Sequence, residues 1–299
     1  MKLQIFDFMV VLASVLTPAI DTVAGWWRHV RDASGGPPVE EPVPERDPES
    51  GVFFHFGRAT IITVGAVRAL LRRPLELRST IAQVEALGVQ SVGIAITTAV
   101  LVGMVMAVQF AYGLQRFGGM EYTGRFIGLS FTRELAPTLT GIVVGGRMAA
   151  GMAAEIGAMA VSEQVDAIKA CGADPLKKLV VPRLVGAVIV MPILGMIALV
   201  TGFCGAMLMT SHEFGIPAQF FYRTALDSVK LVDLWSGLLK MPVFGALIAI
   251  IGCHFGLITK GGTEGVGRYT TRAVVVSAIT VLVSDYFLTT LTVMVWPSQ

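Results

Sequence analysis

The stretch Ser91–Leu114, SVGIAITTAVLVGMVMAVQFAYGL, contains no charged residue. About 20 consecutive apolar residues are enough for a helix to cross the hydrocarbon core of a bilayer, so this stretch predicts a transmembrane helix. Apolar runs of comparable length follow at Arg125–Ala150, Leu179–Met209, Leu238–Thr259 and Ala273–Trp296. We therefore expect an all-α polytopic membrane protein in which residues 91–299 form a five-span domain.

The composition of the whole chain agrees with this expectation. Of its 299 residues, 54% are hydrophobic and 15% are charged, whereas a soluble domain has about 25% charged residues. Charge is depleted because it is costly at bilayer depth. The formal net charge of +2 gives no reason to expect a nucleic-acid partner. The three cysteines form no CxxC pair and the four histidines are scattered, so we expect no metal site and no cofactor in this chain.

The first 90 residues divide into three segments. Residues 1–30 hold an apolar run with Asp7 and Pro18, which predicts either an extra span or an interfacial helix; a signal peptide fits poorly because only Lys2 precedes the run. Residues 31–50 are rich in Pro and Glu and predict a linker. Residues 51–90 predict an elbow, with an amphipathic helix over 51–76 that either lies in the headgroup region or packs on the protein.

Basic residues gather in alternate connections between the spans, and this bias sets the orientation of the chain. The richer connections contain Arg58, Arg68, Arg72, Arg73 and Arg78, then Arg147, Lys169, Lys177, Lys178 and Arg183, and finally Lys260, Arg268 and Arg272. The poorer connections contain Arg116 and Arg125, and Arg223, Lys230 and Lys240. We expect the richer connections to be cytoplasmic and the C-terminus to lie on the outer, periplasmic side.

One cytoplasmic connection is patterned as a helix: Met159–Lys178, MAVSEQVDAIKACGADPLKK. Helical spacing places apolar residues on one face and charged residues on another. The apolar face holds Val161, Val165, Ile168 and Gly172, and the charged face holds Glu163, Asp166 and Lys169. Gly172 and Pro175 are expected to end the helix. Such a helix either docks into a groove of a partner or is a solvated connection, and the pattern alone favours the latter.

The second predicted span contains Arg133-Glu134, followed by Pro137. An ion pair at membrane depth is costly unless it faces protein or water, which makes it a functional candidate. The alternative is a structural salt bridge inside the protein.

Small residues recur every four positions in the same span, at Gly141, Gly145, Ala149, Ala153 and Gly157. This pattern predicts close approach of another helix, in the same subunit or in a second one.

The segment Gly262–Tyr269 imitates a phosphate-binding loop, but Arg268 and Tyr269 occupy the Lys and Ser/Thr positions and no strand precedes it. We expect a flexible cytoplasmic turn there. No Ser-His-Asp set, HExxH or GxSxG motif is present, so we expect no catalytic site.

Three stretches together resemble the MlaE/YrbE-type permeases of MCE-associated lipid ABC transporters. They are LSFTRELAPTLTGIVVGGRMAAGMAAEIGAM (Leu129–Met159), SEQVDAIKACGADPLKKLVVPRL (Ser162–Leu184) and GVGRYTTRAVVVSAITVLVSDYFLTTL (Gly265–Leu291). The resemblance covers roughly Gly51 to Val295 and leaves residues 1–50 without an account.

The resemblance implies an N-terminal interfacial amphipathic helix plus five transmembrane helices, with a cytoplasmic coupling helix between spans two and three. It also implies a homodimer in the bacterial inner membrane, a cytoplasmic ABC ATPase subunit that binds ATP and Mg, and a periplasmic MCE-domain protein. The complex would move phospholipid or related lipids between the inner and outer membranes.

The resemblance further implies roles for individual residues. The coupling helix corresponds to about Glu155–Gly172. Its expected ATPase-coupling residues are Glu155, Glu163, Gln164, Asp166, Ala167 and Gly172. The expected residues of the lipid cavity are Arg133, Glu134, Leu135, Leu114 and Phe117.

Two other functions predict different sequence features. A secondary transporter or channel without an ATPase predicts inverted repeats, broken helices and several intramembrane carboxylates, and no repeat is evident. An integral membrane enzyme of lipid metabolism needs clustered His or Asp residues, and the scattered histidines speak against it.

Overall fold

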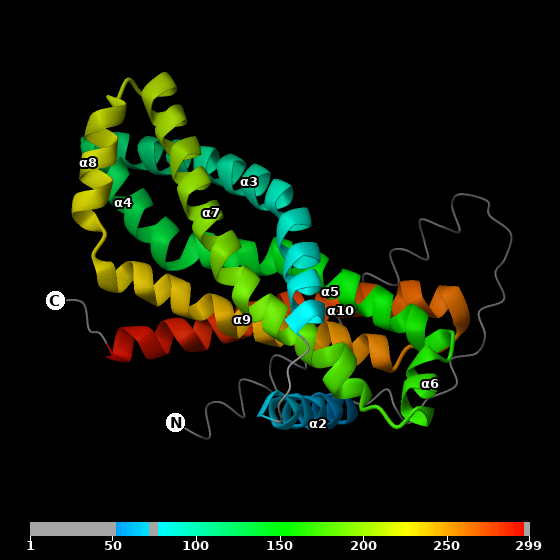
Figure 1. The fold of residues 1–299 in the computed structure, drawn as a ribbon. Helices are drawn as coiled ribbons and strands as arrows, with labels where there is room; N and C mark the ends of the chain where they lie inside the picture. Colours follow the sequence, from blue (N-terminus) through cyan, green and yellow to red (C-terminus); the bar gives the residue numbers. More distant parts are fainter. Residues whose placement is uncertain (1–51, 72–76, 296–299) are drawn as a thin grey trace, which may run out of the picture. The chain divides into compact units, whose positions relative to one another are not determined.

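The computed structural model describes residues 52–71 and 77–295, and the elements within these ranges are helices (Figure 1). The predictions for residues 1–30 and 31–50 lie outside the described residues. Helix α2 covers Val52–Leu71. The first span is α3, Leu77–Gln115, so residues 77–90 of the predicted elbow form a helix that continues directly into the membrane span.

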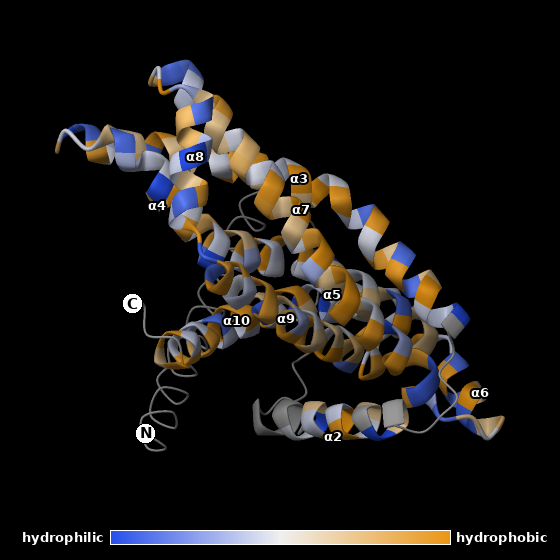
Figure 2. Cartoon of the chain, turned by 60° about the vertical axis from the view of Figure 1, so that its left-hand side comes forward, coloured by the Kyte–Doolittle hydropathy of each residue, from blue (hydrophilic) through white to orange (hydrophobic). Residues whose placement is uncertain are grey.

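The five predicted spans are confirmed. The second span consists of α4 (Thr123–Ser130), the π-helical turn η3 (Phe131–Leu135) and α5 (Ala136–Val161). The third combines the π-helical turn η4 (Leu176–Val180) with α7 (Val181–Glu213). The fourth and fifth are α9 (Leu231–Leu257) and α10 (Gly262–Val295). Figure 2 shows hydrophobic residues along these helices and hydrophilic residues near α6 and around α4 and α8.

Small residues allow the spans to pack closely. In α5, Gly141 lies against Phe244 of α9, and Gly145 against Ile248. In return, Gly252 of α9 lies against the carbonyl of Ala149. The small-residue run therefore packs on a helix of the same subunit. Helix α10 lies against both α5 and α9, α9 lies against α7, and α7 lies along α3.

Helix α2 packs on the protein through one face only. Ile62, Ala66 and Ala69 are buried, whereas Ile61 is 70% exposed. The helix contacts η4, α7 and α9. The structure thus supports the prediction that this helix packs on the protein, and it leaves an apolar face of the helix uncovered.

A short helix between the third and fourth spans was not predicted. Helix α8, Ala218–Ser228, packs on α4 through Phe221 and Ala225. Gly124 and Gly128 of α4 lie against the carbonyls of these two residues. The sequence does contain a sign of this helix, because Phe221 and Ala225 are four positions apart and follow Pro217. Residues 218–228 are nevertheless too few and too polar to be recognised as a membrane span.

The prediction of one helix over Glu155–Gly172 was wrong at its beginning. Helix α5 continues to Val161, and Glu163 adopts a left-handed backbone with a φ of 59°. This break separates α5 from α6, Gln164–Ala170. The predicted end is confirmed: Gly172 has a φ of 75°, and the N–H groups of Gly172 and Ala173 donate to the carbonyls of Lys169 and Ile168, as in a Schellman motif.

The prediction of a flexible turn at Gly262–Tyr269 was also wrong, because these residues form the first two turns of α10. The connection between α9 and α10 is residues 258–261, and the left-handed backbone lies at Gly261 and Gly262, whose φ angles are 90° and 66°. The N–H of Gly265 then donates to the carbonyl of Gly261 and begins the helix.

Replacing Gly103 by Leu should destabilise the protein, because a Cβ at this position would clash with the backbone carbonyl of Gly202 and force α3 away from α7. Overpacking of this kind costs about 1–3 kcal/mol. Gly93 on the same helix has no heavy atom within 4 Å of the corresponding Cβ position, so Gly93→Leu is the matched control. Thermal unfolding of both variants in detergent tests this, and equal melting temperatures would contradict the packing.

Candidate functional site

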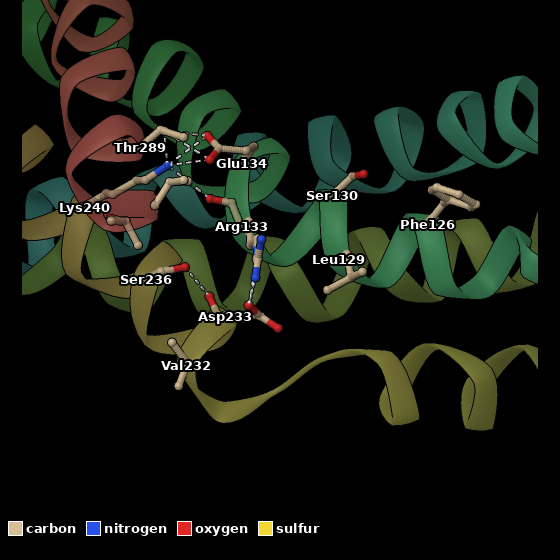
Figure 3. A pocket seen from close by; sticks show the side chains of 12 residues that line it. Phe126, Leu129, Ser130, Arg133, Glu134, Val232, Asp233, Ser236, Lys240 and Thr289 are labelled. Atoms are coloured by element: carbon tan, nitrogen blue, oxygen red, sulfur yellow. Dashed lines mark hydrogen bonds and ion pairs between the residues drawn. The ribbon is translucent and has the colours of Figure 1, made fainter. Parts of the chain in front are cut away.

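A cluster of charged residues lies inside the bundle, contributed by three spans. It consists of Arg133 and Glu134 from η3, Asp233 and Lys240 from α9, and Asp285 from α10. Most of the cluster borders a cavity of about 390 Å³ (Figure 3). The cavity is lined by Phe126, Leu129, Ser130, Arg133, Glu134, Val232, Asp233, Ser236, Lys240, Thr289, Thr292 and Val293.

Lys240 is the centre of this cluster. Its side chain is 3% exposed, and its Nζ lies 2.8 and 2.9 Å from the two carboxylate oxygens of Glu134. The same Nζ lies 3.1 Å from Oδ1 of Asp285 and 2.7 Å from Oγ1 of Thr289. A buried ammonium is tolerated only when nearby acceptors compensate its lost hydration. Lys240 therefore joins η3, α9 and α10 by one set of charge-assisted hydrogen bonds.

A proline explains why Lys240 also contacts the backbone of η3. Pro137 has no N–H, so it cannot donate to the carbonyl of Arg133 four residues earlier. Nζ of Lys240 donates to that carbonyl instead, at 3.3 Å. Gly237 lies against the carbonyl of Thr132, which lets α9 approach the π-helical turn closely enough for this contact. Such turns often mark functional sites.

Arg133 forms a separate ion pair with Asp233. Its Nε donates to Oδ1 of Asp233 at 2.7 Å. The other oxygen of Asp233 accepts the N–H of Lys230 at 2.9 Å and so caps the first turn of α9. Because Asp233 is buried and fixed by this cap, it holds Arg133 in place. The Arg133 side chain remains 41% exposed and borders the cavity.

The prediction of an ion pair between Arg133 and Glu134 was wrong. Adjacent residues on a helix point about 100° apart, and here Arg133 pairs with Asp233 whereas Glu134 pairs with Lys240. The prediction that Lys240 lies in a connection is also wrong, because it belongs to α9. Asp285 was missed, although a carboxylate in the middle of an apolar run was a signal for it.

The structure brings together two of the five predicted cavity residues. Arg133 and Glu134 border the cavity, whereas Leu135, Leu114 and Phe117 are not among its lining residues. Phe117 lies beyond the end of α3 and is 88% exposed. The assignment of these three residues to a lipid cavity stays a prediction.

The predicted coupling residues lie at the end of the spans where α5 meets α6 (Figure 1). Val165 is buried and anchors α6. All six are exposed: Glu163, Gln164, Asp166, Ala167 and Gly172 at α6, and Glu155, whose side chain is 58% exposed. Asp166 pairs with Lys169 at 2.7 Å on the surface. Glu155 is separate from them, because it belongs to α5 and pairs with the buried Arg183 of α7 at 2.8 Å.

Comparisons with known proteins decide the family. A family model described as Permease MlaE matches residues 80–291. A protein of Synechocystis sp. named "Probable ABC transporter permease protein" is 40% identical over 219 residues, which cover 73% of this chain and 83% of that protein. A Rickettsia felis protein with the same description is 38% identical over 235 residues, covering 79% and 91%.

The chain belongs to the MlaE permease family.

A chloroplast relative extends the comparison beyond bacteria. "Protein TRIGALACTOSYLDIACYLGLYCEROL 1, chloroplastic" of Arabidopsis thaliana is 36% identical over 228 residues, which cover 76% of this permease and 65% of that protein.

The MlaE-family chain is therefore an ABC transporter permease, a multi-pass membrane protein and not an enzyme. A permease of this type works with an ATPase subunit, so the alternative of a transporter or channel without an ATPase is overturned. The matched region extends from within α3 to within α10 and includes both the charged cluster and α6.

Replacing Lys240 by Met should destabilise the permease strongly, because Glu134 and Asp285 would then face each other without a cation. Breaking a buried ion pair in this way costs about 3–5 kcal/mol. The control is Lys178→Met at an exposed position. Thermal unfolding in detergent is the measurement. Adding Glu134→Gln and Asp285→Asn to Lys240→Met should recover part of the loss, and an equally stable single variant would contradict the central role of Lys240.

Proposed function

We propose that this permease moves phospholipid or related lipids between membranes, driven by an ATPase subunit that binds at α6. The observation that carries the proposal is the mixed lining of the cavity beside the charged cluster. Phe126, Leu129, Val232 and Val293 give it apolar walls, while Arg133 and Glu134 remain partly exposed within it. An amphiphile needs both kinds of surface, the apolar wall for acyl chains and the charged groups for its headgroup.

Arg133 is the residue that would contact a phosphate. Its guanidinium is held on one side by Asp233 and remains partly exposed. A planar guanidinium with donors on two edges can pair with a carboxylate and a phosphate at the same time. The name of the Arabidopsis relative contains that of a glycolipid, which supports a lipid as the substrate.

The ATPase subunit would bind the exposed face of α6. Glu163, Gln164 and Asp166 extend from a short helix that is fixed to the spans by Val165. Motion of α6 would pass to α5 directly, because only the break at Ser162 and Glu163 separates the two helices. Glu155 would contribute indirectly, because its ion pair with Arg183 links α5 to α7.

The proposal includes an assembly and an orientation. We infer a homodimer in the bacterial inner membrane, with α6 in the cytoplasm, the C-terminus on the periplasmic side and an MCE-domain protein as the periplasmic partner. The excess of Lys and Arg near the α6 end of the spans supports this orientation, and the family resemblance supports the partners.

Filling the cavity should stop lipid transfer without preventing ATPase binding. Val293 borders the cavity, so Val293→Trp places an indole where the acyl chains would lie. Leu291 on the same helix does not line the cavity and is equally exposed, so Leu291→Trp is the control. The measurement is transfer of a fluorescent phospholipid by the reconstituted complex. We expect loss of transfer only for Val293→Trp, and normal transfer by this variant would reject the cavity as the lipid path.

Reversing the charge of Asp166 should weaken binding of the ATPase subunit about tenfold or more, since a lost charge contact at an interface costs at least about 2 kcal/mol. Asp166 is exposed and its own partner Lys169 is on the surface, so Asp166→Lys should not unfold α6. Glu264→Lys at the exposed start of α10 is the matched control. Co-purification of the ATPase with each variant is the readout, and equal recovery from both would refute docking at α6.

A further inference from the structure

A second cavity, of about 420 Å³, lies between α3, α5 and α10. Its polar lining comes from Gln83 and Gln90 of α3, Arg147 and Glu155 of α5, and Thr270 of α10. It shares no lining residue with the cavity beside Arg133. Arg147 follows Arg133 by 14 positions, which corresponds to roughly 20 Å along a helix. The two cavities therefore lie at different depths in the bundle.

Within the described residues, the guanidinium of Arg147 donates its hydrogen bonds to neutral groups. Its Nη1 donates to Oγ of Ser91 at 2.7 Å, and its Nη2 donates to Oε1 of Gln90 at 2.9 Å. Among residues 52–71 and 77–295, no carboxylate forms an ion pair with Arg147. Glu155 lines the same cavity but pairs with Arg183. Within the part of the chain that the structure describes, the Arg147 guanidinium is therefore oriented by neutral groups and paired with no carboxylate.

The contacts of Arg147 also fix its depth. Ser91 begins the uncharged run of α3, and the polar residues Gln83, Glu85 and Gln90 precede it. Thr270 likewise precedes the apolar run of α10 that begins at Ala273. Arg147 thus lies at the boundary between the apolar core and the polar ends of the helices on the α6 side. Lipid phosphate groups lie at this level of a bilayer, and basic pockets between spans are sites where they bind.

We propose that this second cavity binds the phosphate group of a membrane lipid, with Arg147 as its cationic partner. Ser91 and Gln90 hold one edge of the guanidinium, so the cavity side is presented to the ligand. A phosphodiester is the anion that the surrounding bilayer supplies at this depth, and pairing with it removes the cost of an unpaired cation. This site is additional to the transport cavity, and its occupation requires neither ATP nor the ATPase subunit.

Gly151 provides an independent way to block the site. It lines the cavity, and no heavy atom lies within 4 Å of the position that its Cβ would take. A phenylalanine there would enter open space without displacing a neighbouring helix, and replacing a helical glycine does not weaken the helix. Gly151→Phe therefore fills the cavity while Arg147 stays intact. Gly93 of α3 also has open space beside it and does not line the cavity, so Gly93→Phe is its control.

The test uses the full chain in phosphatidylcholine vesicles that contain a small fraction of phosphatidylglycerol with a photoreactive group near the glycerol. Crosslinked peptides are identified by mass spectrometry. We expect crosslinks to residues 77–91 and 147–155. The yield should fall about tenfold for Arg147→Gln, which loses one charge-assisted contact, and at least as much for Gly151→Phe, which fills the cavity. Arg268→Gln removes an exposed arginine of α10 that does not line the cavity and should leave the yield unchanged.

Two outcomes would overturn the proposal. One is an unchanged yield for Gly151→Phe, which decides the matter even where Arg147→Gln fails to fold. The other is a free anion as the ligand: inorganic phosphate would then abolish crosslinking and would raise the melting temperature in detergent as much as phosphatidylglycerol does. Because no ATPase or transport assay is involved, failure here is distinguishable from failure of the proposed transport function.

Discussion

A positive charge inside an apolar bundle has to be compensated, and the packing of three spans depends on how Lys240 achieves this. Its ammonium group is bound by Glu134 and Asp285 and by the carbonyl of Arg133. That carbonyl is available because Pro137 cannot donate to it. The π-helical turn, the fourth span and the fifth span are therefore held in one arrangement by a single side chain, with the cavity beside it.

Small residues make this arrangement possible by bringing helix backbones close together. Lipid tails are as apolar as the helices, so burial of apolar surface gives little reason for the spans to associate, and close van der Waals contact replaces it. Gly103 against Gly202 joins α3 to α7, and Gly252 against Ala149 joins α9 to α5. Gly237 lets α9 pack closely against η3, which places Lys240 within hydrogen-bond distance of the Arg133 carbonyl.

The two cavities differ in their depth along the bundle and in how the charges of their lining residues are paired. The cavity beside Arg133 contains cations that are already paired with carboxylates, so a lipid could enter and leave it without exposing an unpaired charge. The cavity beside Arg147 presents a cation whose bonds within the described chain are to neutral groups. In the functions proposed above, the first cavity takes the transported lipid and the second takes a lipid that stays bound. The cavity beside Arg147 is lined by α5 itself, which continues to Val161 just before α6, and the cavity beside Arg133 is lined by η3, which directly precedes α5.

The amino-acid sequence by itself determined the five spans and the end of α6, because apolar length and the left-handed preference of Gly172 are local properties. It also marked Arg133 and Glu134 as unusual, since a charge in an apolar run is visible without a structure. Their partners were not predictable: Asp233, Lys240 and Asp285 come from spans about 100 to 150 positions away, and only packing selects them. Two further features were decided by the tertiary structure. The left-handed backbone at Glu163 is unfavourable for a non-glycine residue and persists only when neighbouring helices hold it. The cavity around Arg147 likewise forms only once the helices that line it are in place.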